Sequence, residues 1–289
     1  MEQIRLKNTL NLKIYSPPGA RKGTLLILHG MLEHLDRYQD LIKRLNGHGY
    51  AVAGFNYFGH GDNTPLGVMT PEMIPGILSG IKESVEILVK RDEEAPVTLL
   101  GHSLGSFLAR LVLDEVPVNR VILSGAGRVD PKKVGRTGFA LKLVAPFIDR
   151  DRPRQWLSDM VFKDFNRPFG GTAGALFISS EASEQAAYLA DPLTGGPISL
   201  GFAQLLIHLM TQVRHKENAL KAIDVPLVFI SGEMDPVGEF GRGVRAVADD
   251  YRAINASTTK TRLFRGRHEI LRDLDREEVI QEILAQLKG

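Results

Sequence analysis

Strand-like apolar runs and segments of helical periodicity alternate along most of the chain. The predicted strands are Ile4–Leu6, Leu10–Tyr15, Thr24–Leu28, Ala51–Asn56, Val97–Leu100, Val121–Leu123, Pro226–Ser231 and Lys260–Phe264. Apolar residues recur at helical spacing in Tyr38–Leu45, Pro71–Arg91, from Leu104 onward, in Val244–Arg252 and in Arg276–Leu287. This order predicts the α/β class, with a mostly parallel central sheet that carries helices on both faces.

The alternation is interrupted between about Arg128 and His215, where no strand-like run separates the helical segments. Open α/β sheets bind ligands beyond the carboxyl ends of their strands, so an insertion is best placed above that edge. The predicted organisation is a core of residues 1–127 and 218–289 that is split by a helical cap insertion of residues 128–217.

Composition narrows the classes of function. The 289 residues are 43% hydrophobic and 24% charged, with a net charge of +2, which is ordinary for a globular protein and does not indicate nucleic-acid binding. The absence of cysteine excludes disulfides, thiolate catalysis and zinc–cysteine sites. No apolar run has transmembrane length and the N-terminus lacks a signal-peptide core, so we expect a cytoplasmic location. The sequon Asn255–Ser257 is expected to form an exposed loop.

The segment GHSLG, residues 101–105, stands where a predicted strand gives way to a helix. Ser103 therefore lies on a sharp turn, and Gly101 and Gly105 leave room for it. A serine in this place can simply cap a helix, because its oxygen accepts an amide hydrogen bond. A strand before the serine and a helix after it are also the setting of a nucleophile elbow, which favours a catalytic role.

Asp235 and His268 each lie in a loop that follows a predicted strand. These loops and Ser103 fall at one edge of a parallel sheet, so His268 could take the serine proton and Asp235 could orient the imidazole. Glu233 is a rival acid, and an aspartate before Pro236 could serve only to form a turn. We favour Asp235 because it lies further from the strand end and has room to reach His268.

A developing oxyanion needs hydrogen-bond donors that are already in place. We expect the backbone amides of Leu104, at the helix start after Ser103, and of Met31, after the strand that ends near His29. For His29 itself we expect a structural hydrogen bond. His268 and Glu269 lack the second histidine of a metalloprotease motif, and we expect neither a metal site nor a cofactor.

Seven stretches are shared with a known group of enzymes: His29–Gly30, Glu33–His34, Arg37–Tyr38, Gly59–Gly61, GHSLGS, SGEMDPVG and GRHEIL. In these the chain resembles the monoglyceride lipase and lysophospholipase branch of the α/β-hydrolases, which is grouped with serine aminopeptidase-type (S33) hydrolases. The resemblance implies an α/β-hydrolase fold with a helical cap and a catalytic triad of Ser103, Asp235 and His268. It also implies that Met31 and Leu104 supply the oxyanion amides.

The chain departs from this family at Asn56-Tyr57-Phe58, where the family usually has Asp-x-Arg before its Gly-His-Gly. The loop must therefore be held differently. We expect the four residues Glu33, His34, Arg37 and Tyr38 to anchor the loop beside the oxyanion amides rather than to touch the substrate.

The leading hypothesis is a serine esterase that cleaves carboxylic esters through an acyl-enzyme intermediate, with the resemblance implying monoacylglycerol or lysophospholipid-type substrates. An aminopeptidase or amide hydrolase on the same fold would need a cap acid for the substrate amine, and Asp149, Asp151 and Asp159 are candidates. A non-catalytic ligand-binding protein is the third hypothesis, which the complete set of Ser, Asp and His argues against.

The insertion is rich in apolar residues, including Phe147 and Phe202, and we expect it to line a pocket for an acyl chain. Burial of a methylene group contributes about 0.8 kcal/mol, which would favour such a pocket. The expected partners are a small ester or lipid and, through transient contact of the cap, a membrane surface. The sequence does not define the oligomeric state.

Overall fold

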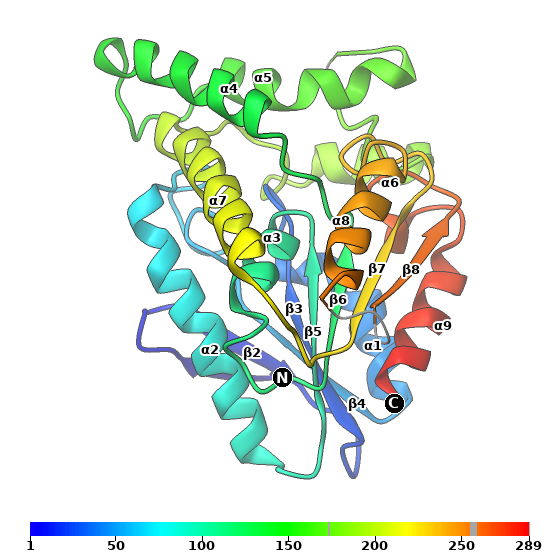
Figure 1. Ribbon diagram of the computed structural model, residues 1–289. Coiled ribbons are helices and arrows are strands. Elements are labelled where there is room, and N and C mark those ends of the chain that lie inside the picture. The colour runs from blue at the N-terminus through cyan, green and yellow to red at the C-terminus, as the bar shows by residue number, and fades with distance from the viewer. Residues whose placement is uncertain (173, 255–258, 289) are drawn as a thin grey trace.

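A sheet of eight strands runs through the described part of the chain, which in this computed structural model is residues 1–172, 174–254 and 259–288 (Figure 1). The sequon Asn255–Ser257 lies outside the described residues. The strands are β1 (Glu2–Arg5), β2 (Asn11–Tyr15), β3 (Gly23–Leu28), β4 (Tyr50–Gly54), β5 (Val97–His102), β6 (Arg120–Ser124), β7 (Leu227–Gly232) and β8 (Thr259–Phe264). Their order is β1-β2-β4-β3-β5-β6-β7-β8. Only the β1–β2 and β2–β4 pairings are antiparallel, so the predicted mostly parallel sheet is confirmed.

Helices cover both faces of the sheet. The helices of the described chain are α1 (Gln39–Gly47), α2 (Ile74–Arg91), α3 (Leu104–Val112), α4 (Pro131–Val144), α5 (Gln155–Asn166), α6 (Ala182–Ala190), α7 (Leu200–Ala219), α8 (Arg242–Arg252) and α9 (Arg276–Leu287). Short 3-10 helices are η1 (Leu35–Tyr38), η2 (Pro71–Met73), η3 (Ala145–Phe147), η4 (Arg167–Phe169) and η5 (Ile270–Arg272). One apolar core lies between the sheet and α2, α3 and α8, and the other lies between the sheet and α1 and α9.

Strand periodicity explains why both faces are covered. In β3, Leu26 and Leu28 belong to the first core, whereas Leu25 and Ile27 belong to the second. Successive side chains of a strand point to opposite faces, so a strand that is buried on both faces is apolar throughout. β3, β5 and β7 are buried along their whole length, which is why continuous apolar runs predicted them.

The segment between β6 and β7 contains α4, α5, α6 and α7 and, among its described residues, only one isolated β-bridge, between Arg154 and Ile198. α4 and α5 lie beyond one end of the sheet, and α7 descends to pack against α3 (Figure 1). The helical character predicted for this stretch is therefore confirmed. Throughout the described ranges, no helix is both long and apolar enough to cross a bilayer.

The strand predicted at Ala51–Asn56 ends earlier, at Gly54. Asn56 is buried beyond the strand end and uses its side chain in loop contacts, accepting a hydrogen bond from the Leu35 amide (2.8 Å) and donating to Asp62 (2.7 Å). These contacts replace sheet pairing, and an apolar pattern alone does not reveal them.

Candidate active site

Ser103 occupies the corner between β5 and α3 in a strained backbone conformation, with φ 51° and ψ −114°. A positive φ is unfavourable for a residue with a side chain and persists only when the surroundings impose it. The Ser103 amide donates to the Ser124 carbonyl (2.9 Å), and the Ser103 carbonyl accepts from both the amide (2.9 Å) and the hydroxyl (2.6 Å) of Ser106. Neighbours on both sides therefore hold the corner.

The glycines of GHSLG allow this corner to pack against the neighbouring strand. A Cβ atom on Gly105 would lie 2.0 Å from the carbonyl oxygen of Leu28, at the end of β3, and one on Gly101 would lie 2.5 Å from the Gly105 carbonyl oxygen. Backbone atoms occupy both spaces and cannot move aside as a side chain could. The room that the sequence suggested is thus required by two backbone contacts.

Asp235 and His268 form a buried hydrogen-bonded pair, with 3.0 Å between Asp235 Oδ2 and His268 Nδ1. They lie beyond the ends of β7 and β8, at the same edge as Ser103, and His268 and Ser103 line one cavity. Asp235 also accepts from the Ser231 hydroxyl (3.0 Å) and the Val237 amide (2.9 Å). The rival acid Glu233 is exposed.

The electrostatics of this pair favour an imidazolium opposite a carboxylate. Burial opposes charge on the ring, but the Asp235 carboxylate raises the pKa of His268 above its ordinary value. Burial likewise would raise the pKa of Asp235, yet His268 and the donors on Ser231 and Val237 lower it. Because a carboxylate oxygen accepts, Nδ1–H points to Asp235 in the neutral ring, and Nε2 is then the nitrogen that can take up a proton to form the imidazolium.

The imidazole of His268 is positioned by contacts that the sequence did not reveal. A Cβ on Gly125, whose φ is +60°, would lie 2.9 Å from His268 Cε1, so only glycine lets the ring sit there. On the other side, the amides of His268 and Glu269 donate to the carbonyls of Phe177 (3.1 Å) and Ile178 (2.8 Å). The α4–α7 segment is thus tied directly to the histidine loop.

Met31 and Leu104 line the cavity that contains Ser103. Leu104 is the first residue of α3, where amides have no partner within the helix and can bind an anion. Met31 lies in a loop that Glu33 holds by accepting hydrogen bonds from the Gly30 amide and from the Tyr38 hydroxyl (2.9 Å). The arrangement can present two amides toward an oxygen bound near Ser103.

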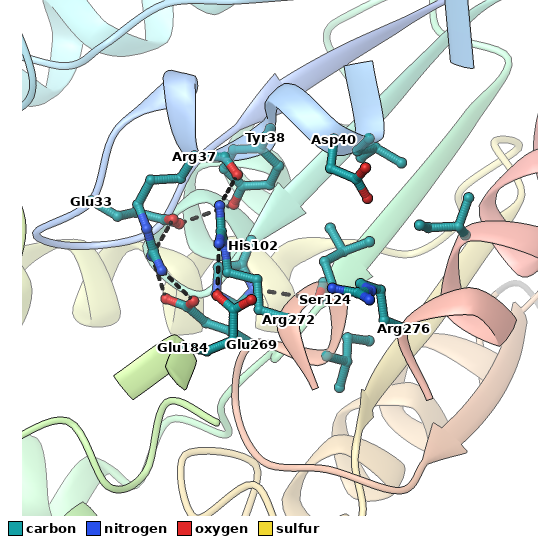
Figure 2. A pocket seen from close by; sticks show the side chains of 14 residues that line it. Glu33, Arg37, Tyr38, Asp40, His102, Ser124, Glu184, Glu269, Arg272 and Arg276 are labelled. Atoms are coloured by element: carbon teal, nitrogen blue, oxygen red, sulfur yellow. Dashed lines mark hydrogen bonds and ion pairs between the residues drawn. The ribbon is translucent and has the colours of Figure 1, made fainter. Parts of the chain in front are cut away.

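Arg37 joins this loop to the histidine loop (Figure 2). Its guanidinium makes two hydrogen bonds to Glu269, of 2.6 and 2.8 Å, and one to Glu33 of 3.2 Å. Burial would raise the pKa of Glu33, but nearby positive charge, including that of Arg37, and the hydrogen bond from the Gly30 amide hold this pKa well below its ordinary value. His34 bonds Asp191 (2.8 Å), next to α6. The expectation that Glu33, His34, Arg37 and Tyr38 anchor the loop agrees with these contacts.

Between the two positions that depart from the family pattern, Asn56 and Phe58, Tyr57 holds the loop by hydrogen bonds. The Tyr57 hydroxyl donates to the His29 carbonyl (3.1 Å), and the Tyr57 amide donates to His29 Nε2 (3.4 Å). His29 Nδ1 in turn donates to the Gly30 carbonyl (2.8 Å). Burial lowers the pKa of His29 to about 3, so the ring stays neutral. It makes structural hydrogen bonds, as expected from the sequence.

Two cavities of different character meet at this site. Ser103 and His268 line an apolar cavity of about 110 Å³. Much of its apolar lining comes from α3, α5 and α7, through Phe107, Val161, Phe162, Phe165, Leu206 and Met210. The other cavity, of about 300 Å³, has a mixed lining of aliphatic side chains and charged groups, and the charged groups include Asp40, Glu184, Arg272 and Arg276 (Figure 2). Glu33, His102 and Glu269 line both cavities, which are therefore adjacent.

The expected pocket residues Phe147 and Phe202 are not among those that line either cavity. Phe147 is 84% exposed, and Phe202 is fully buried with its ring 5.5 Å from that of His60. Leu206 and Met210, on the same helix as Phe202, face the cavity instead. Within the described ranges, no three His, Asp or Glu side chains are grouped as a metal site would require.

The comparisons with known proteins agree with this geometry. Residues 19–275 match the profile of a family described as serine aminopeptidase, S33. Monoglyceride lipase of Mus musculus is 24% identical over 229 residues, which cover 77% of this chain and 68% of that protein. Monoacylglycerol lipase of Mycolicibacterium smegmatis is 24% identical over 227 residues, covering 77% of this chain and 73% of that protein. A carboxyl esterase structure from Bacillus coagulans has a TM-score of 0.80 and 22% identity, covering 100% of this chain and 96% of that one.

The Asp235–His268 pair makes a testable prediction about titration. Asp235→Asn removes the charge that raises the pKa of His268 and leaves burial, which lowers it, so the pKa of His268 should fall. NMR titration of the His268 ring protons measures this directly. Glu233→Gln is the matched control and should leave the His268 titration unchanged. A fall in the pKa of His268 in Glu233→Gln, with no change in Asp235→Asn, would contradict the pairing of Asp235 with His268.

Proposed function

Because the chain belongs to the serine aminopeptidase S33 family and has the α/β-hydrolase fold, we propose that it is a serine hydrolase of carboxylic esters. One observation carries the proposal. Ser103, at its strained corner, lines the same cavity as His268, and His268 is hydrogen-bonded to Asp235. The monoglyceride and monoacylglycerol lipase relatives support substrates of the monoacylglycerol type, and the sequence resemblance adds lysophospholipid-type esters as the alternative.

In the proposed reaction, Ser103 Oγ attacks the ester carbonyl carbon while His268 Nε2 accepts the hydroxyl proton. The carbonyl oxygen becomes an oxyanion that the amides of Met31 and Leu104 stabilise. His268 then gives its proton to the departing alkoxide, which leaves as the alcohol, and the acyl group stays on Ser103. A water molecule attacks the acyl-enzyme by the same proton transfers and releases the carboxylic acid. Asp235 holds the imidazole orientation throughout.

The two cavities suggest how the two parts of an ester are distinguished. The acyl chain would lie in the apolar cavity, where its burial is favourable. A polar alcohol such as glycerol would leave toward the adjacent larger cavity, where carboxylates and guanidinium groups offer hydrogen bonds. Residues 128–217 would act as the cap, because α5 and α7 supply apolar walls above Ser103.

Ester hydrolysis is favoured over aminopeptidase activity by the carboxylates near Ser103. Asp149 and Asp151 are exposed, and Asp159 does not line the cavity that contains Ser103. Glu33 and Glu269 line that cavity, but both are bonded to Arg37. Glu33 and Glu269 are the two carboxylates among the described residues that line this cavity. A substrate amine would therefore have to compete with the buried Arg37 guanidinium for one of them.

Ser103→Ala should abolish turnover of soluble p-nitrophenyl esters and labelling by a fluorophosphonate probe, while the protein stays folded. Loss of a serine nucleophile costs about 10⁶-fold in kcat in a well-studied protease. Ser79→Ala, which changes an exposed serine on α2, is the matched control and should keep both properties. Retained turnover in Ser103→Ala, or probe attachment at another serine, would refute the assignment.

Contact of the cap with a membrane is the second part of the proposal. Phe139, Leu143 and Phe147 are spaced four residues apart along α4 and η3 and are 64%, 59% and 84% exposed. Exposed basic residues accompany them: Lys132, Lys133, Arg136 and Lys142. Residues 131–148 contain no acidic residue. An apolar stripe beside basic groups fits an anionic lipid surface.

Wild-type protein should therefore bind vesicles that contain phosphatidylglycerol more strongly than neutral phosphatidylcholine vesicles, and salt should weaken that binding. The double variant Phe139→Ser with Leu143→Ser should bind at least about tenfold more weakly, because each side chain loses apolar burial. Leu274→Ser, which changes an exposed leucine outside the cap, is the control. Vesicle co-sedimentation measures all three, and equal binding by the double variant would exclude α4 as the contact surface.

A further inference from the structure

The apolar cavity is bounded by an aromatic wall. The rings of Phe162, on α5, and Phe177 stack with centroids 5.4 Å apart and an interplanar angle of 24°. The ring of Phe177 lies 5.7 Å from that of His268, so the wall stands beside the candidate catalytic histidine. An acyl chain that enters this cavity must meet these rings.

A second cavity, also of about 110 Å³, adjoins the first. Phe162, Phe177 and Tyr188 line both cavities and therefore form the wall between them. The rest of the second cavity includes polar side chains, among them Gln155, Asp159 and Asn166. The wall of Phe162, Phe177 and Tyr188 separates this second cavity from the cavity that Ser103 lines.

Two of the three wall residues are fixed by hydrogen bonds. Tyr188 donates its hydroxyl to the Leu32 carbonyl (3.2 Å). Phe177 accepts at its carbonyl from the His268 amide (3.1 Å) and donates its amide to Asn166 (3.1 Å). Phe162 is only partly buried and contributes an apolar ring. Its ring is thus the part of the wall that can change without disturbing the loops that hold the site.

We propose that Phe162 sets the length of acyl chain that the enzyme accepts, an inference that rests on the proposed ester hydrolysis. A dry cavity of about 150 Å³ accommodates benzene, so a space of about 110 Å³ suits roughly four carbon atoms. The substrate class that follows is a short-chain acyl ester, with a chain that ends at Phe162 and Phe177. Removal of the Phe162 ring joins the two cavities and lengthens the available path.

A chain-length series of p-nitrophenyl esters tests this. For the wild type, kcat/KM should rise from acetate to about pentanoate or hexanoate and fall by decanoate. In Phe162→Ala the optimum should move by at least two carbons. Because each newly buried methylene is worth about fourfold in kcat/KM, the ratio of decanoate to butanoate turnover should rise by about tenfold or more.

Trp156→Ala is the matched control, because it removes an exposed aromatic ring from the same helix and should leave the profile unchanged. Phe162→Leu, a smaller change, should give an intermediate shift and keeps the test valid if the alanine variant does not fold. An unchanged profile in the folded Phe162 variants, an equal shift in Trp156→Ala, or a wild-type optimum at dodecanoate would overturn the inference. Failure of wild-type protein to hydrolyse any ester would instead refute the proposed function.

Discussion

The carbonyl oxygen of Leu28 lies so close to Gly105 that no side chain fits between β3 and the first turn of α3. This contact sets the position of α3 above the sheet, and Ser103 takes its positive φ at the corner that results. The loop that carries Met31 begins directly after β3, so the same contact brings that loop beside Ser103. The positions of Ser103, of the Leu104 amide and of the Met31 amide thus depend on one close approach of backbone to backbone.

A buried charge network extends this order to the histidine loop. Arg37 bonds Glu33 in the first loop and Glu269 next to His268, and both carboxylates are buried. A buried charge without a partner would be costly, so the three groups hold one another in place. The nearby imidazole of His102 stays neutral, because burial lowers its pKa to about 4. The pKa of His268, beside Asp235, is shifted in the opposite direction, which supports the proposal that His268 is the base.

The local pattern of apolar residues predicted the strands and the residues that directly follow them. Ser103, Asp235 and His268 were proposed from the sequence because each follows a predicted strand, and the mostly parallel sheet was predicted from the same strand-like runs. Arg37 and Glu269 are 232 residues apart, and no periodicity links them. The wall of Phe162 and Phe177 depends on how an inserted helix packs against a loop, and for the same reason Phe147 was wrongly expected in the pocket.

We propose that Ser103 Oγ and the amides of Met31 and Leu104 form one reactive centre. A crystal structure of the protein after reaction with a short-chain alkyl fluorophosphonate tests it most directly. We expect phosphorus bonded to Ser103 Oγ, a phosphonyl oxygen within hydrogen-bond distance of both amides, and the alkyl chain against Phe162. Phosphorus on another residue, or a phosphonyl oxygen turned away from Met31 and Leu104, would contradict it.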